Sequence, residues 1–148
     1  MKRLLVAVDG SDGSNAAVEE ALALAADLRA AVTFAYVRRP PSLLLGDPFY
    51  QRVLTGEFAE ACSAVAEAME AAAAVGIEAD SEILEGDPCD EIVSLADNRG
   101  ADLIVVGSRG FGALAGALLG SVSRAVLQHA HRPVLVAKQV GARERQVA

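Results

Sequence analysis

The sequence has no tryptophan, few aromatic residues and only two cysteines. With aromatic residues at 4% of the chain, we expect no exposed platform on which nucleic-acid bases could stack. Cys62 and Cys89 lie far apart, without a CxxC pair, so neither a disulfide framework nor a zinc site is predicted. Both are expected to be small buried or half-buried residues. The net charge of −7 also excludes a broad surface for nucleic acid or an anionic membrane.

A membrane-spanning run is missing as well. Gly112, Gly116 and Gly120 repeat at the four-residue spacing of transmembrane helix pairs. However, only 14 uncharged residues separate Arg109 from Arg124, whereas a spanning helix needs about 20 apolar residues. The N-terminal stretch MKRLLVAVDGSDGS has too short an apolar core for a signal peptide. We therefore expect a cytoplasmic protein without a membrane partner.

What the sequence does contain is an alternation of short apolar runs and longer helical patterns. This alternation is typical of βαβ units and predicts one α/β domain over residues 1–140, followed by a frayed polar tail over 141–148. Continuous apolar runs at Arg3–Val8 and Leu103–Val106, and a nearly continuous one at Val32–Val37, predict central parallel strands. The alternating residues from Ile77 to Ile83 predict a half-exposed edge strand.

Four helical patterns separate the strands. They cover Ser14–Arg29, Glu57–Val75, a segment that begins at Pro88 with Asp87 as its N-cap, and a last segment from near Ser121 to before Pro133. The second pattern has an apolar stripe, which consists of Phe58, Cys62, Val65, Met69 and Ala72. Three prolines between Arg38 and Val53 predict a long loop, which could be a lid, a partner surface or a simple connection.

Five glycines between Gly107 and Gly120 follow a predicted strand and precede a predicted helix. Unpaired N–H groups at a helix start bind phosphate, and glycines at 107, 110 and 120 would permit positive φ and close approach by ligand oxygens. Ser121 would cap the helix. A glycine-rich connection that only reverses the chain is the alternative. The usual nucleotide motifs do not fit, because the P-loop lysine is missing and the spacing GxGxxxG differs from the dinucleotide fingerprint.

Gly107, Gly110, Gly120 and Ser121 match the pattern G-x2-G-x9-G-[ST]. In this respect the sequence resembles the ATP-binding branch of the universal stress protein family. The segments LLVAVDGSDGS, ADLIVVGSRG and GSVSRAVLQHAHRPVLVAK resemble further blocks of that family. The resemblance implies an open, five-stranded parallel sheet in the order 3-2-1-4-5 with helices on both faces, a Rossmann-like fold similar to the adenine nucleotide alpha hydrolases.

The resemblance also implies a nucleotide site at the switch point between the first and fourth strands. Asp9 would hold the ribose, or the metal and triphosphate, and the backbone of Val37 would meet adenine. The implied nucleotide-binding residues are Asp9, Gly10, Val37, Gly107, Arg109, Gly110, Gly120, Ser121, Val122 and Ser123. The expected cofactors are ATP and Mg²⁺, although no metal ligand set can be named.

We expect a binding protein rather than an enzyme, with slow ATP hydrolysis at most, since no lysine, paired carboxylates or histidine accompany the glycines. The strand Pro133–Lys138 would lie at a sheet edge, and the resemblance implies a homodimer through it. Two alternatives stay open. One is a nucleotide-free dimeric interaction protein of the same family. The other is a PP-loop-type ATP pyrophosphatase, whose SGGxDS motif is replaced here by DGSDGS.

Overall fold

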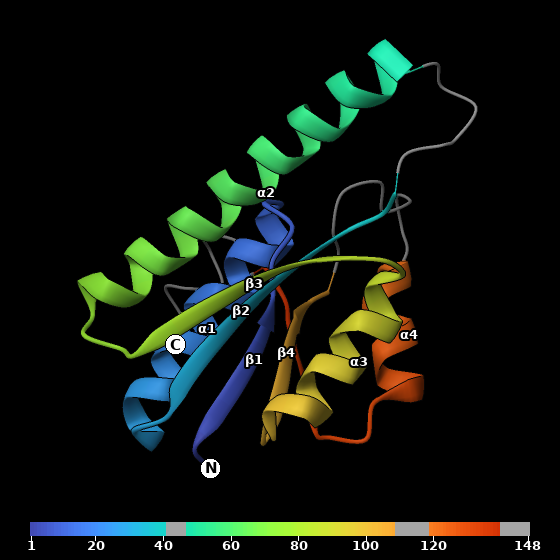
Figure 1. Ribbon diagram of the computed structural model, residues 1–148. Helices are drawn as coiled ribbons and strands as arrows, with labels where there is room; N and C mark the ends of the chain where they lie inside the picture. The colour runs from blue at the N-terminus through green and yellow to red at the C-terminus, as the bar shows by residue number, and fades with distance from the viewer. Residues whose placement is uncertain (41–46, 109–118, 140–148) are drawn as a thin grey trace.

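The computed structural model describes residues 1–40, 47–108 and 119–139. Within these ranges five strands alternate with four helices (Figure 1). The strands are β1 (Arg3–Ala7), β2 (Ala31–Arg38), β3 (Ala79–Glu85), β4 (Leu103–Gly107) and β5 (Val134–Ala137). The helices are α1 (Asp12–Leu28), α2 (Asp47–Ala74), α3 (Pro88–Arg99) and α4 (Ser121–His129).

The strands form one parallel sheet in the order β3-β2-β1-β4-β5, which confirms the predicted fold. The central strands β1 and β4 are the continuous apolar runs, and their inner residues are buried because helices cover both faces. β3 and β5 lie at the two edges, as predicted, and most of their residues are only half-buried.

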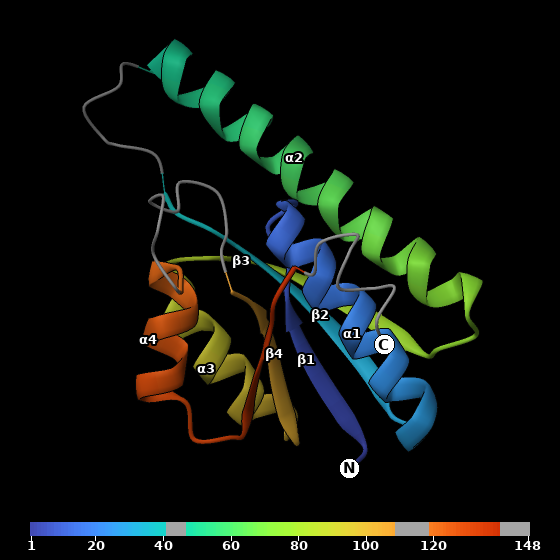
Figure 2. The same ribbon diagram turned by 180° about the vertical axis from the view of Figure 1, so that it is seen from behind.

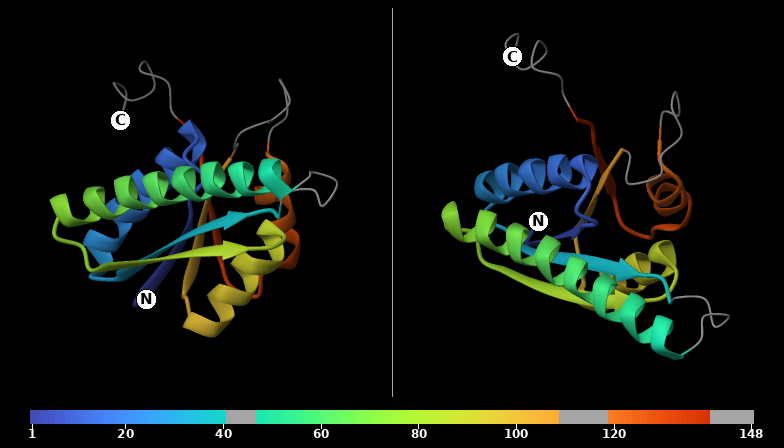
Figure 3. Two further views of the ribbon diagram at one scale, coloured as in Figure 1. Left: turned by 45° about the horizontal axis from the view of Figure 1, so that its top comes forward. Right: turned by 90° about the horizontal axis from the view of Figure 1, so that it is seen from above.

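The helices cover the sheet in two pairs. The connections through α1 and α2 lead toward β3, whereas those through α3 and α4 lead toward β5, so the right-handed crossover rule puts the pairs on opposite faces. α3 and α4 lie side by side in Figure 1, and α1 lies in front of the sheet in Figure 2. Figure 3 shows α2 running in the direction opposite to β2 and β3.

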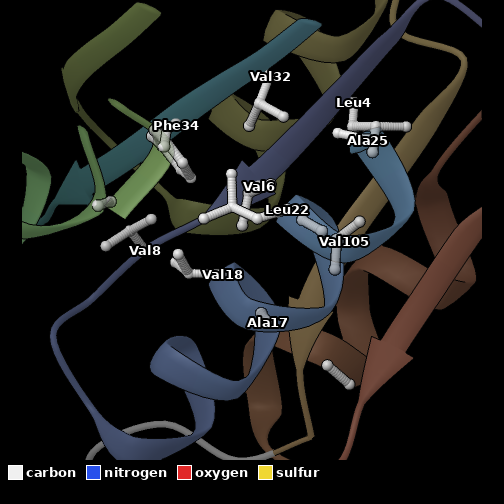
Figure 4. Close-up of a cluster of buried hydrophobic side chains, with 14 of the residues drawn as sticks. Leu4, Val6, Val8, Ala17, Val18, Leu22, Ala25, Val32, Phe34 and Val105 are labelled. Carbon is white, nitrogen blue, oxygen red and sulfur yellow. The ribbon is translucent and has the colours of Figure 1, made fainter. Parts of the chain in front are cut away.

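The largest apolar cluster lies between the sheet and α1 (Figure 4). Val6 and Phe34 from the sheet are fully buried there, and α1 contributes a stripe at helical spacing that includes Val18 and Leu22. A second cluster around Ile92 and Ile104 joins α3 and α4 to the other face. Both faces are therefore closed by apolar packing, and the carboxyl ends of the strands lie between the two helix pairs.

Helix α2 differs from its prediction at both its start and its buried face. It begins at Asp47, so the predicted loop to Val53 is wrong over its last residues, because Pro48 lies in the first turn, where its missing N–H needs no partner. The predicted stripe is also wrong in part. Val65 and Ala72 are buried, as predicted, but Phe58 is 51% exposed and Cys62 is exposed rather than buried or half-buried. In their place the helix buries the alanines Ala61, Ala64 and Ala68. Cys89 is buried, as expected. None of the described helices is long and apolar enough to cross a membrane.

A polar network fastens the amino ends of the strands. The fully buried Thr33 hydroxyl accepts a hydrogen bond from Arg3 Nη1 (2.8 Å) and donates one to Asp80 Oδ1 (2.6 Å). Arg99 of α3 binds Asp80 (2.8 Å) and also pairs with Glu82. Burial tends to raise the pKa of Asp80, but the hydrogen bonds from Thr33 and Arg99 outweigh it and hold that pKa below its ordinary value. The network joins β1, β2, β3 and α3 at the edge opposite the predicted site.

Candidate functional site

The predicted site lies between β1 and β4, where the direction in which successive strands are added to the sheet reverses. β1 pairs with β2 on one side and with β4 on the other, so the connections after β1 and β4 leave on opposite faces. Open α/β sheets bind ligands in the crevice at such a point, beyond the carboxyl ends of the strands. Asp9 follows β1 directly and Gly107 ends β4, so both residues lie at this crevice, as predicted.

The turn after β1 is cross-linked by its own side chains. Asp9 Oδ1 accepts hydrogen bonds from the N–H of Ser11 (2.8 Å) and from the Ser11 hydroxyl, and the Asp9 N–H donates to Ser14 Oγ (3.0 Å). Ser11 is the N-cap of α1, which leaves Asp9 outside the capping role. Gly10 has a φ of +83°, a conformation that favours glycine. This turn holds the half-buried Asp9 carboxylate at the end of β1.

Gly107 is required by packing against α1. A Cβ atom at this position would lie 2.5 Å from the carbonyl carbon of Gly13 and against its carbonyl oxygen. The φ of Gly107 is not positive, so the conformational reason given for this glycine is wrong. The first turn of α1 therefore touches the end of β4 backbone to backbone, which brings the turn at Asp9 close to the start of the glycine-rich segment.

The two ends of the glycine-rich segment are joined at Ser108. Its carbonyl oxygen accepts hydrogen bonds from the Gly120 N–H (2.6 Å) and from the Ser123 hydroxyl (3.3 Å), and its own N–H donates to the Ala137 carbonyl of β5 (2.9 Å). Ser123 Oγ also lies 3.0 Å from the Gly120 carbonyl oxygen. The residue after β4 and the residue before α4 are therefore hydrogen-bonded directly to each other, so the two ends of the segment lie side by side.

Helix α4 begins without a side-chain cap. Gly120, rather than Ser121 as predicted, is the N-cap residue, and among the described residues no side chain hydrogen-bonds the first turn in that role. Gly120 has φ −71° and ψ 166°, which any residue can adopt, so its predicted positive φ is also wrong. The N–H groups of Ser121 and Val122 have no intrahelical acceptor at this position. As far as the described residues show, the start of α4 therefore offers N–H groups that can donate hydrogen bonds to an anion.

The flank toward α2 is acidic, which the sequence did not indicate. Burial raises the pKa of the Tyr36 phenol above its ordinary value. The nearby carboxylates of Glu60, Asp9 and Glu57 raise that pKa further. Glu57 Oε2 is buried without a hydrogen-bond partner among the described residues. The pairing of β1 with β2 and the packing of α2 on β2 bring these groups together, so no local motif could have predicted them.

The remaining predicted residues are distributed as follows. Val37 lies in β2, half-buried, and pairs in register with Leu84. Ser123 is 3% exposed, so its side chain is not a surface group. Arg109 and Gly110 lie outside the described residues, as does the tail over 141–148. No group of three metal-binding side chains occurs within the described part of the chain.

Comparison with known proteins gives a consistent result. The model of the universal stress protein family matches residues 1–138. A universal stress protein of Thermus aquaticus is 39% identical over 140 residues, which cover 93% of this chain and 98% of that protein.

Two solved structures of this family contain adenine nucleotides. A universal stress protein in complex with cAMP is 33% identical, with a TM-score of 0.67, and the match covers 92% of this chain and 95% of that one. The universal stress protein of Archaeoglobus fulgidus in complex with dAMP is 25% identical, with a TM-score of 0.70 and coverage of 92% and 97%. On the sequence match over nearly its whole length and on the shared fold, this chain belongs to the universal stress protein family.

Proposed function

We propose that this protein binds ATP with Mg²⁺ in the cytoplasm, and that its nucleotide-bound state serves stress response or signalling. The observation that carries the proposal is the start of α4. Within the described part of the chain its first turn has no side-chain cap, and the Gly120 N–H binds Ser108 beside the switch point of the sheet. Free N–H groups and the partial positive charge of a helix start bind phosphate.

The charges around the site favour one orientation of the nucleotide. Glu57 and Glu60 of α2 lie near Tyr36, and their carboxylates would repel phosphate on that side. The phosphates would therefore lie at α4, and the neutral base would lie toward β2, near the backbone of Val37. The cAMP and dAMP bound by the two similar proteins contain the same adenine base, which supports an adenine nucleotide here.

Mg²⁺ fits this arrangement only if it binds together with the nucleotide phosphates. Mg²⁺ usually keeps several waters and is held by one or two carboxylates together with substrate phosphates. Asp9 is the described carboxylate at the switch point, and its Oδ1 is already occupied by Ser11. We assign Asp9 either to this metal or to the ribose, and the experiment below separates the two roles.

We also propose that catalysis is weak or absent. Phosphoryl transfer requires neutralisation of charge and an oriented nucleophile. Among the described residues, the turn at Asp9 and the start of α4 supply a carboxylate, hydroxyls and N–H groups, and Arg38 at the end of β2 is paired with Glu85 (2.9 Å). Turnover should stay far below the roughly 1–100 s⁻¹ of kinases. Sustained phosphate release that disappears in an Asp9 variant would show an enzyme instead.

The functional unit is proposed to be a homodimer. β5 is an edge strand, and Val134, Leu135 and Val136 are only half-buried in the single chain. An apolar edge strand of this kind pairs readily with another chain. A twofold axis would place β5 antiparallel to its copy.

Calorimetric titration with ATP, cAMP, AMP and adenosine tests the site. Ser121→Ala removes a hydroxyl, whereas Ser121→Pro also removes the N–H at the first helical position, where proline is tolerated. Pro88 already occupies the same position of α3, and the ψ of 166° at Gly120 suits a following proline. Each lost hydrogen bond to phosphate should cost about 1.5–3 kcal/mol, or roughly 10- to 150-fold in ATP affinity.

Asp9→Asn keeps an acceptor for Ser11 and removes the charge. If Asp9 serves the metal, this variant should weaken ATP only when Mg²⁺ is present; if it serves the ribose, adenosine should weaken too. Ser63→Ala on the exposed side of α2 is the matched control. Unchanged ATP affinity in a well-folded Ser121→Pro variant would contradict this placement of the phosphates, whereas absence of ATP binding by the wild type would favour the nucleotide-free dimer.

A further inference from the structure

Ser123 is one of the residues expected to contact the nucleotide, but its side chain is already engaged. It is 3% exposed, and its hydroxyl oxygen lies 3.3 Å from the Ser108 carbonyl oxygen and 3.0 Å from the Gly120 carbonyl oxygen. A serine hydroxyl has a single proton to donate. That proton is shared between two carbonyl groups, so none remains for a phosphate oxygen.

The two acceptors have different roles. The contact with Gly120 is a local bond within one helical turn, which serine commonly forms. The contact with Ser108 crosses from the first turn of α4 to the end of β4. Ser108 is itself fixed by the sheet, because its N–H donates to Ala137 of β5 (2.9 Å). The Ser123 hydroxyl therefore ties the start of α4 to a rigid part of the fold.

We infer that Ser123 is a positioning residue for the nucleotide phosphates: its hydroxyl holds the first turn of α4 against Ser108, so that the N–H groups of Ser121 and Val122 stay at the switch point. The inference rests on the proposed function. Without this hydroxyl, the Gly120 N–H bond to Ser108 (2.6 Å) is the remaining described hydrogen bond between the two segments. The start of α4 then samples more orientations in the free protein. Because phosphate binding has to restrict them, the affinity for the nucleotide falls.

Two substitutions separate the hydrogen bond from the packing. Ser123→Ala removes the hydroxyl and leaves a small void, whereas Ser123→Cys fills nearly the same volume with a weak donor. If the hydrogen bond matters, both variants should lose about 3- to 10-fold in ATP affinity, the effect of one ordinary hydrogen bond. Adenosine affinity should stay within about 2-fold of wild type, because adenosine carries no phosphate for the helix start to hold.

The experiment combines calorimetry with amide hydrogen exchange at Gly120 in the nucleotide-free protein. Exchange at this amide should be faster in both variants, since its bond to Ser108 loses its neighbour. Ser123→Cys gives the answer if Ser123→Ala does not fold. Equal losses of ATP and adenosine, wild-type affinity in Ser123→Cys, or unchanged exchange at Gly120 would each overturn the inference. Absence of ATP binding by the wild type would instead overturn the proposed function.

Discussion

Substitution of Gly107 by alanine tests whether packing or the ligand requires a bare backbone at the end of β4. The added Cβ atom would lie 2.5 Å from the Gly13 carbonyl carbon and 3.1 Å from the Ser14 N atom. Both atoms belong to the backbone of α1, so no side chain can rotate away. The first turn of α1 has to move, together with the hydrogen bonds that join Ser14 to Asp9 and Ser11.

The size of the effect follows from this geometry. Overpacking in a close-packed region costs about 1–3 kcal/mol, and displacement of backbone rather than side chain places Gly107→Ala at the upper end, about 3 kcal/mol. For a domain of this size each kcal/mol shifts the melting temperature by about 3 °C. We therefore expect the melting temperature to fall by about 9 °C. The midpoint of urea unfolding should fall correspondingly, without a large change in the slope of unfolding free energy against urea concentration.

Gly56→Ala is the matched control. Gly56 lies within α2, and a Cβ atom there would meet nothing within 4 Å. The free energy of unfolding of this variant should rise by about 0.5–1 kcal/mol, because alanine loses less backbone entropy than glycine when it enters a helix. The reasoning is refuted if the free energy of unfolding of Gly107→Ala lies within about 0.5 kcal/mol of the wild-type value, which is well below the expected overpacking cost. If that stable variant also failed to bind ATP, close approach by the ligand would be the reason for the glycine.

Three further predictions concern other parts of the fold. Thr33→Val keeps the volume at a fully buried position but leaves Arg3 and Asp80 without their hydroxyl partner, so urea unfolding should show a loss of about 1–3 kcal/mol, and Thr33→Ser should recover most of it. The pKa of Asp97 is lowered by its hydrogen bonds from His131 and then Arg132, so its contribution to stability is complete above the unfolded value near 3.9 and is lost as pH falls through the lower folded pKa. Asp97→Asn should therefore flatten the acid side of the stability curve; an identical curve would contradict this. Val136→Lys puts a charge on the half-buried edge strand β5 and should yield monomer in light scattering, whereas a wild type that is already monomeric at tens of micromolar would refute the dimer.

The strands could be predicted from the sequence because their signals are local, whereas their order was implied by the family resemblance. Continuous apolar runs predicted the central strands, and Asp87 followed by Pro88 predicted the start of α3, where Asp87 accepts from the Asp90 N–H (3.1 Å). The start of α2 was missed because proline was interpreted as a helix breaker, although it is compatible with a first turn. The exposure of Phe58 and Cys62 was missed because alanines also pack well against a sheet, and helical spacing alone does not decide which stripe is buried.

The candidate site, too, could be predicted only in part. The positions of Asp9 and Gly107 at the switch point followed from the strand order that the family resemblance implies, and the sheet has that order. The reason for Gly107 did not, since it depends on a backbone contact with Gly13, a residue distant in sequence. Likewise Ser123 was grouped with the ligand contacts on the family resemblance, and only the structure reveals that Ser108 and Gly120 occupy its hydroxyl.

The polar network around Thr33 bears on how such a domain can diversify. It fixes the register of β1, β2 and β3 at their amino ends, with α3 attached through Arg99, and it uses no residue from the connections at the opposite edge. Insertions, deletions or exchanged sequences in those connections can therefore accumulate without unpairing the strands. A frame anchored at one end leaves the other end free to acquire new ligand preferences, and the same sheet can carry them at little cost in folding.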